Sequence, residues 1–204
     1  MARSCNFCRD EKLEQAMELF WQKGYEATSV ADLVNHLGIN RFSLYNSYGD
    51  KLTLYREALR HYLYTRGLPG LARLESDQGT LADLLDLVEA FAAKQREQQY
   101  GCFMQNAVLE RGVADEEVKC LANELFTALN RAFTKVLSRT LPPERAVSLA
   151  AYLVMQLQGI RVLGKAGQFE LLESALDVLR EQIKGWDGAQ ALSLCSLPES
   201  PLRR

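Results

Sequence analysis

Apolar residues recur with helical spacing from the first part of the chain onward. The first such segment carries apolar residues at i, i+3, i+4 and i+7, namely Leu13, Ala16, Met17 and Phe20. Gly24 follows this segment, and glycine is favoured just past the C-terminus of a helix. The pattern predicts a first helix over residues 10–23.

The next segment predicts two short helices separated by a glycine turn. Ser29, with an aspartate three residues later, has the form of a capping box and places a helix over about residues 29–36. Gly38 supplies the positive φ that a tight turn requires. Asn40 is suited to cap a short helix over about residues 41–47.

The apolar pattern continues through six further segments and shows no strand-like alternation and no internal repeat. The further helices are expected over 51–65, 80–99, 103–111, 115–139, 143–164 and 168–183. The sequence therefore predicts an all-α protein of about nine helices.

Glycine and proline between residues 67 and 79 mark a boundary between two parts of the chain. We expect a flexible N-terminus over 1–9, a three-helix helix-turn-helix domain over 10–66, a C-terminal helical domain over 67–184 and a disordered tail over 185–204.

Composition is that of an ordinary soluble protein, with 48% hydrophobic and 25% charged residues and a formal net charge of −2. The longest uninterrupted apolar run, Leu149 to Met155, is far shorter than the roughly 18 residues of a membrane span, and the N-terminus lacks a signal peptide. These features predict a cytoplasmic protein with no membrane partner. Because positive charge is not concentrated strongly in either half, a nucleic-acid role must rest on local geometry.

Cysteine usage and the absence of catalytic motifs exclude several classes of site. The five cysteines are odd in number and accompany no export signal, which favours free thiols over a disulfide framework. Cys5 and Cys8 have CxxC spacing but no second pair of ligands for zinc, so exposed thiols are the favoured interpretation. His36 and His61 stand apart from any carboxylate cluster, and no nucleophile motif or phosphate loop is present. We expect no catalytic activity, metal or cofactor.

The helix pair joined at Gly38 has the form of a DNA-binding helix-turn-helix. Leu44, six residues after the glycine, is expected to face back into the core, and Val34 to pack against it. Helix pairs with a glycine turn also occur as plain packing units, so this pattern alone leaves both interpretations open.

A longer ordered set of residues makes the pattern more specific. Its members are Gly24-Tyr25, Thr28-Ser29, Asp32-Leu33, Gly38-Ile39, Leu44-Tyr45, Tyr48 and Lys51-Leu52. Over about residues 10–60 the chain resembles the TetR/AcrR family of repressors. Val34 stands where that family usually has alanine, and Phe42 stands where a small residue or proline is common.

The resemblance implies a repressor that binds a palindromic double-stranded operator and is released by a small-molecule, electrophile or oxidant signal. It also implies that the C-terminal domain binds the ligand and forms a homodimer through helices 143–164 and 168–183. Apolar stripes agree in part with such a four-helix bundle, namely Leu149, Tyr152, Leu153 and Gln156, then Leu172, Leu176 and Leu179. The alternative is a family-like scaffold that joins proteins together and has lost operator binding.

Nine residues are candidates for DNA contact. They are Thr28, Ser29, Arg41, Phe42, Ser43, Tyr45, Asn46, Ser47 and Lys51. Hydroxyl and backbone N–H groups at a helix start, here those of Thr28 and Ser29, suit phosphate. Arg41 suits a bidentate contact to guanine, and Phe42 suits a thymine methyl group. Tyr45 and Lys51 are expected at the DNA backbone, although Lys51 could also be a solvated surface charge; Tyr48 is expected in the core.

The C-terminal domain contains one candidate thiol and one candidate pocket. Cys102 stands at a predicted helix start in a Gly-Cys-x-x-x-Asn sequence that resembles one branch of the family. Such a thiol is either a reactive sensor of electrophiles or a small residue buried at a helix crossing. Residues expected to contact a small hydrophobic or reactive effector are Phe91, Cys102, Phe103, Phe126, Phe133, Tyr152, Met155 and Gln156. Aromatic residues with this spacing are, however, more often core than pocket.

Overall fold

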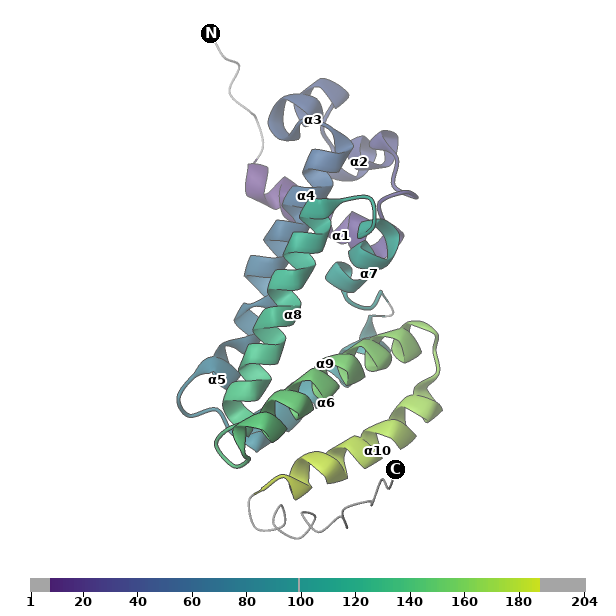
Figure 1. Cartoon of the computed structure of the whole chain (residues 1–204). Helices are drawn as coiled ribbons and strands as arrows, with labels where there is room; N and C mark the ends of the chain where they lie inside the picture. The colour runs from purple at the N-terminus through teal and green to yellow at the C-terminus, as the bar shows by residue number, and fades with distance from the viewer. Residues whose placement is uncertain (1–7, 99, 188–204) are drawn as a thin grey trace, which may run out of the picture. The chain divides into compact units, whose positions relative to one another are not determined.

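The computed structural model describes residues 8–98 and 100–187, and these form helices with no strand among them (Figure 1). The α-helices are α1 (Arg9–Lys23), α2 (Val30–Leu37), α3 (Arg41–Tyr48), α4 (Lys51–Tyr62), α5 (Ala72–Glu75), α6 (Leu81–Glu97), α7 (Phe103–Arg111), α8 (Glu116–Leu137), α9 (Pro143–Lys165) and α10 (Phe169–Gly185). The predicted all-α class is confirmed, and each of the nine predicted helices is present.

The segment that follows α4 is more regular than predicted. A π-helical turn covers Leu63–Gly67 and a 3-10 turn covers Pro69–Leu71, directly before α5. Leu63, Leu71 and Leu74 are buried, so this segment has an apolar face of its own. Glycine and proline here mark a change of helical geometry and not a loop, because the amide of Leu68 reaches the carbonyl of Leu63 five residues back.

The described residues group into two compact units. The first unit contains the chain up to Ala72 together with Gln98–Ala128, and the second contains Arg73–Glu97 and the residues from Leu129 onward. Helix α8 begins in the first unit and ends in the second. The functional division expected at residues 66 and 67 stays a prediction.

An aromatic cluster forms the centre of the first unit. Phe20 of α1 contacts Tyr55 of α4 edge-on at 5.0 Å between ring centroids. Phe103 of α7 lies edge-on to both Tyr55, at 5.7 Å, and Tyr62, at 5.8 Å. Aromatic rings carry large apolar areas, and edge-on contacts between them are favourable. The cluster therefore fixes α7 against α1 and α4, the helices that support the N-terminal part of the chain.

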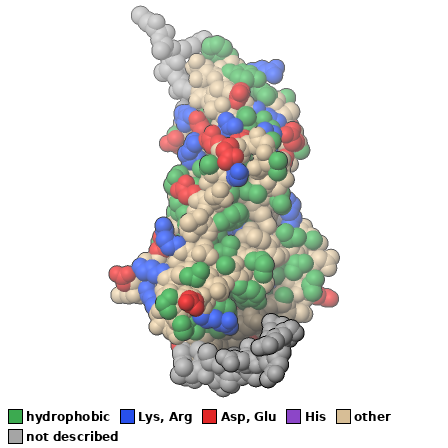
Figure 2. All heavy atoms as spheres, in the orientation of Figure 1, with side chains coloured by type: hydrophobic (Ala, Val, Ile, Leu, Met, Phe, Trp, Pro, Cys, Tyr) green, Lys and Arg blue, Asp and Glu red, His purple; other side chains and the backbone are tan. Residues whose placement is uncertain are grey.

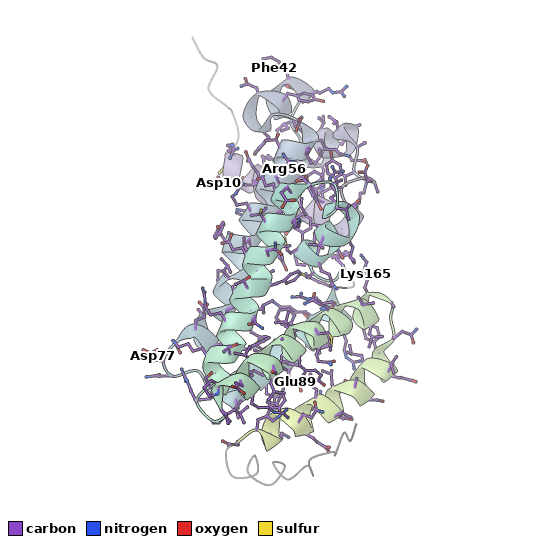
Figure 3. The ribbon with its side chains drawn as sticks, in the orientation of Figure 1. Asp10, Phe42, Arg56, Asp77, Glu89 and Lys165 are labelled. Carbon is purple, nitrogen blue, oxygen red and sulfur yellow. The ribbon has the colours of Figure 1, made fainter. Side chains whose placement is uncertain are left out.

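Helices α6, α9 and α10 pack together in the second unit. Leu84 and Val88 of α6 are buried, as are Leu153 and Leu157 of α9. Glu89 of α6, labelled in Figure 3, accepts two hydrogen bonds from Arg180 of α10. Helix α9 is long and apolar enough to cross a membrane by length and composition alone. Its inward face is packed against α6 and α10.

The predicted dimer stripe needs a correction. Leu153 of α9 and the α10 residues Leu172, Leu176 and Leu179 are 5% exposed or less, because they are covered by their own unit. A second set of apolar side chains on the same two helices is more than half exposed instead: Val147, Met155, Val162, Leu171 and Val178. Helical periodicity identified an apolar face correctly, but it could not show that the chain itself covers that face.

Candidate nucleic-acid interface

Helices α2 and α3 meet at a turn that only glycine adopts without strain. Gly38 has a φ of 62°, and the amide of Ile39 donates to the carbonyl of Val34. After the turn, the Oδ1 atom of Asn40 accepts from the amide of Ser43 at 2.8 Å and caps α3. The direction in which α3 leaves the turn is therefore fixed by backbone and cap together.

The two sides of α3 differ sharply in exposure. Leu44 is fully buried and Tyr48 is 2% exposed, with the Tyr48 hydroxyl donating to the carbonyl of Arg9 at 2.6 Å. Phe42 is 80% exposed and projects outward from the helix (Figure 3), while Tyr45 is 42% exposed. Burial of Leu44 and Tyr48 confirms the two core predictions for this helix.

The outer side of α3 carries most of the residues proposed for base contact. Arg41, Phe42, Tyr45 and Asn46 are exposed, and Ser43 and Ser47 are half-buried beside them. The Arg41 guanidinium lies 5.9 Å from the Tyr45 ring centroid, so cation and ring share one side of the helix. One rigid helix thus presents a basic, an aromatic and an amide group together.

The start of α2 uses its hydroxyl groups internally. The Ser29 hydroxyl accepts from the amide of Asp32 at 3.0 Å, and the amide of Ser29 donates to the Asp32 carboxylate at 2.8 Å, which completes the predicted capping box. The hydroxyl of Ser29 also donates to that carboxylate and, with Lys23, lowers the Asp32 pKa to about 2. Thr28 is fully buried and its hydroxyl donates to the carbonyl of Gly24 at 2.6 Å. The Thr28 hydroxyl is therefore not free to donate to a phosphate, although the sequence predicted that it would.

Lys51 holds the turn that precedes α2. Its ammonium donates to the carbonyls of Tyr25 and Thr28, each at 2.8 Å, and lies 4.0 Å from the centroid of the Tyr25 ring. Lys51 is therefore not a fully solvated charge. It stabilises the turn before α2, in addition to any contact with phosphate. A phosphate contact through its remaining N–H stays a prediction.

Side chains of α7 bind the turn before α2, and the sequence did not predict this contact. The Glu110 carboxylate accepts from the amides of Tyr25, at 2.9 Å, and Glu26, at 2.8 Å. Arg111 lies 4.3 Å from the Tyr25 ring centroid and pairs with Glu26 at 2.9 Å. These partners are separated by about 85 residues, a distance over which helical periodicity carries no information.

Asp115 ties the start of α8 to α4. Its carboxylate is almost fully buried, accepts from two nitrogens of Arg56 and also accepts from the amides of Glu117 and Val118. Burial alone would raise the pKa of Asp115, but the hydrogen bonds from Arg56 and the backbone outweigh it and hold that pKa below its usual value. Figure 2 shows acidic and basic side chains interleaved over this part of the surface.

The start of α7 places Cys102 in the interior. Cys102 is 3% exposed, and its sulfur lies 3.5 Å from the hydroxyl of Tyr62. The indole N–H of Trp21 donates to the carbonyl of Gly101 at 3.1 Å. Of the two interpretations offered for this thiol, the structure places it as the buried residue at a helix start, and its reactivity stays a prediction.

The residues proposed for the effector pocket divide between the two units. Cys102, Phe103 and Phe126 belong to the first unit, whereas Phe91, Phe133, Tyr152, Met155 and Gln156 belong to the second. Phe103 is part of the aromatic cluster, and Phe133 is fully buried. The hydroxyl of Tyr152 donates to Gln182 of α10, and Met155 is 61% exposed. Neither unit alone brings the whole set together.

The remaining cysteine predictions are tested only in part. Cys5 and Cys195 lie outside the described residues, while Cys8 and Cys120 are exposed free thiols. Among the residues that the structure describes, no group of three or more His, Cys, Asp or Glu side chains is arranged to hold a metal ion.

Comparison with known proteins identifies the family. Residues 13–58 match the family model described as bacterial regulatory proteins, tetR family, and this range runs from α1 through most of α4. The part of the chain from α1 through most of α4 is therefore that of the TetR family of transcriptional regulators. This match confirms the resemblance drawn from the sequence.

Relatives that match longer stretches of the chain support the same assignment. It is 29% identical to the HTH-type transcriptional repressor ComR of Escherichia coli K12 over 191 residues, which cover 88% of this chain and 89% of ComR. It is 33% identical to the uncharacterized HTH-type transcriptional regulator YezE of Bacillus subtilis 168, but that match covers 58% of this chain and 62% of YezE. A solved structure of a cysteine variant of the TetR-family regulator CifR, complexed with 26-base-pair double-strand operator DNA, is 27% identical, with a TM-score of 0.72 over 91% of this chain and all of that chain.

Proposed function

We propose that this TetR-family protein is a transcriptional repressor that binds operator DNA through α3 and releases it when an effector reaches its C-terminal part. The observation that carries this proposal is the asymmetry of α3. Its inner side is locked by Leu44 and Tyr48, and its outer side offers Arg41, Phe42 and Asn46 to a groove. A recognition helix needs this combination of rigid support and free side chains.

The exposed groups have the chemistry of base reading. A guanidinium such as that of Arg41 makes two parallel hydrogen bonds to guanine in the major groove. An amide such as that of Asn46 can do the same with adenine, and the ring of Phe42 suits a thymine methyl group. Tyr45 and Ser47 lie on the same helix and are assigned to the sugar-phosphate backbone. Of the phosphate donors predicted at the start of α2, the backbone amides are retained and the Thr28 hydroxyl is not.

A homodimer supplies the second recognition helix. Figure 2 shows apolar side chains gathered along α9, and the exposed residues there include Val147, Met155 and Val162. Leu171 and Val178 extend the exposed apolar surface onto α10. Apolar side chains spaced along two adjacent helices suit a four-helix bundle made with a second copy. A regulator of this kind acts where the chromosome is, which places it in the cytoplasm.

We infer that the effector signal passes along α7 to the turn before α2. Cys102 and Phe103 stand at one end of this helix, inside the aromatic cluster, and Glu110 and Arg111 at the other end hold the turn before α2. A ligand or an electrophile that displaces the start of α7 would also disturb that turn. The scaffold alternative does not account for an outer side of α3 that keeps Arg41 and Asn46 exposed.

Selection of genomic DNA fragments by the purified protein tests the repressor proposal. We expect an inverted repeat with half-sites separated by about one helical turn, roughly 34 Å, because a two-fold dimer presents two recognition helices. Recovery of random sequence only would contradict operator binding and favour the scaffold.

Treatment with peroxide or an electrophile tests the role of the thiol. If Cys102 is the sensor, the wild-type protein releases the selected operator after treatment and Cys102→Ser does not. Cys120→Ser, which removes an exposed thiol from α8, is the matched control and should release like the wild type. Equal release by wild type and Cys102→Ser would assign the signal to a non-covalent ligand.

A further inference from the structure

One buried charge in the second unit lacks an opposite charge. Arg161 is 3% exposed and falls on the inward face of α9, in line with the buried residues Leu157 and Gly164. Its Nη1 atom donates to the side-chain oxygen of Gln158 at 3.2 Å, and its guanidinium lies 4.6 Å from the centroid of the Phe91 ring. Within the described residues, no carboxylate forms an ion pair with Arg161.

The chemistry of arginine makes this arrangement incomplete. A guanidinium cannot lose its proton in a protein, and it has five N–H donors in a flat fork that matches a carboxylate. Removing such a charge from water is costly unless a counter-charge replaces the lost solvation. The ring of Phe91 and the neutral oxygen of Gln158 supply only part of that replacement.

A second buried polar group, one helical turn after Phe91 on α6, also lacks a partner for one of its atoms. Gln95 of α6 is 4% exposed; its amide nitrogen donates to the carbonyl of Phe91 at 3.0 Å, and its Oε1 atom has no hydrogen-bond partner among the described residues. A buried acceptor without a partner is rare in folded proteins and points to a group that the protein alone does not supply.

Helices α6 and α9 bring these two groups to the same contact. A Cβ atom added at Gly164 would lie 2.3 Å from the Cβ of Gln95, so the glycine allows the two helices to approach closely there. Phe91 and Gln95 are four residues apart on α6, and Arg161 and Gly164 are three apart on α9, so each pair shares one helix face. The unpaired cation and the unpaired acceptor therefore belong to one contact between α6 and α9.

We propose that Arg161 and Gln95 form a recognition site for a small organic carboxylate, with the guanidinium holding the carboxylate and Gln95 accepting from a hydroxyl or amine of the same ligand. This inference rests on the proposed function, because it names the chemical class of the effector. It predicts that an uncharged amide of the same shape binds far more weakly than the acid, since the amide leaves the guanidinium without a counter-charge.

Thermal unfolding of the full-length protein without DNA gives the first test. The probes are acetate, lactate, octanoate and benzoate, each paired with its amide and compared with sodium chloride at equal ionic strength. We expect at least one carboxylate to raise the Tm of the wild type while its amide does not, and we expect Arg161→Met to lose that rise. Arg145→Met changes an exposed arginine of the same helix and should keep it. If no carboxylate acts through Arg161, the proposal is overturned.

Stability of the ligand-free protein gives a second test that needs no ligand. An unpaired buried charge predicts that Arg161→Met is at least as stable as the wild type in urea, with an unchanged oligomeric state by sedimentation. A clearly less stable Arg161→Met protein, or one that changes its oligomeric state, would make Arg161 a structural or interface residue and overturn the proposal. Neither test involves operator DNA, so failure here leaves the repressor proposal to stand or fall on fragment selection.

Discussion

Asp115 in the first unit and Arg161 in the second are both buried charged residues, but their surroundings are opposite. Asp115 is 2% exposed and receives hydrogen bonds from Arg56 and from two backbone amides. Arg161 is 3% exposed and has one neutral hydrogen-bond partner and one aromatic ring. The described residues satisfy the first charge and leave the second without a counter-charge.

This difference distinguishes charged residues that support the fold from those that are available to bind another molecule. In the first unit, Asp115, Glu110 and Lys51 are engaged in holding α4, α7 and the turn before α2 in one arrangement. In that arrangement the side chains on the outer side of α3 stay exposed and available to contact DNA. In the second unit, the incomplete polar groups are inside, between α6 and α9, where a small molecule and not DNA would meet them.

The largest expected effect is on Asp115, the fully satisfied charge. Asp115→Ala should lower the free energy of unfolding by about 2–4 kcal/mol, because it removes both a buried ion pair and the cap of α8. We expect a loss at the lower end of this range, because the Arg56 side chain is about a third exposed and water can solvate it once the Asp115 carboxylate is removed. Urea unfolding measures the loss, and Glu116→Ala, an exposed neighbour, should change it by less than about 0.5 kcal/mol. Equal effects of both changes would contradict a structural role for Asp115.

The grip of α7 on the turn before α2 should have a smaller effect, seen in DNA binding. Glu110→Gln weakens acceptance from the amides of Tyr25 and Glu26, and we expect operator affinity to fall by about 1 kcal/mol, roughly fivefold. Glu124→Gln is the matched control, because Glu124 is an exposed acid that contacts Tyr64 and not the turn. Fluorescence anisotropy with the selected operator measures both variants; an unchanged Glu110→Gln affinity would remove α7 from the signal route.

Acid should act on the first unit through its depressed carboxyl groups. Asp115 and Asp32 have pKa values below those of the unfolded chain, so their contribution is complete above about pH 4 and is lost as pH falls through their folded values, near 2 for Asp32. Stability of the wild type should therefore fall between about pH 4 and 2. Urea titrations at several pH values measure this change. The free energy of unfolding should depend less steeply on pH in Asp115→Asn than in the wild type, and an identical pH dependence would show that folding does not lower the pKa of Asp115.

Helical periodicity and turn chemistry predicted most of the fold. The spacing of Leu13, Met17 and Phe20 sufficed for α1, and Ser29 with Asp32 located the start of α2 to within a residue. Such signals are local, because the interacting residues are three or four apart in the chain.

The features that complete the site are contacts between distant residues. Glu110 meets Tyr25 and Arg161 meets Phe91 across 70 or more residues, so no local pattern marks either pair. Thr28 was predicted to contact phosphate because it stands at a helix start, yet its hydroxyl donates instead to the carbonyl of Gly24. A short polar side chain often has both options, and tertiary packing decides between them.

Operator binding by α3 is tested most directly by titrating wild type and Arg41→Ala with the selected duplex and with single-base variants of it at several salt concentrations. Arg41→Ala is expected to weaken specific binding by about 1–3 kcal/mol, to relax preference at one base position in each half-site and to leave non-specific affinity nearly unchanged. An equal loss on specific and non-specific DNA, with preference intact at every position, would contradict the assignment of α3 as the helix that reads the operator.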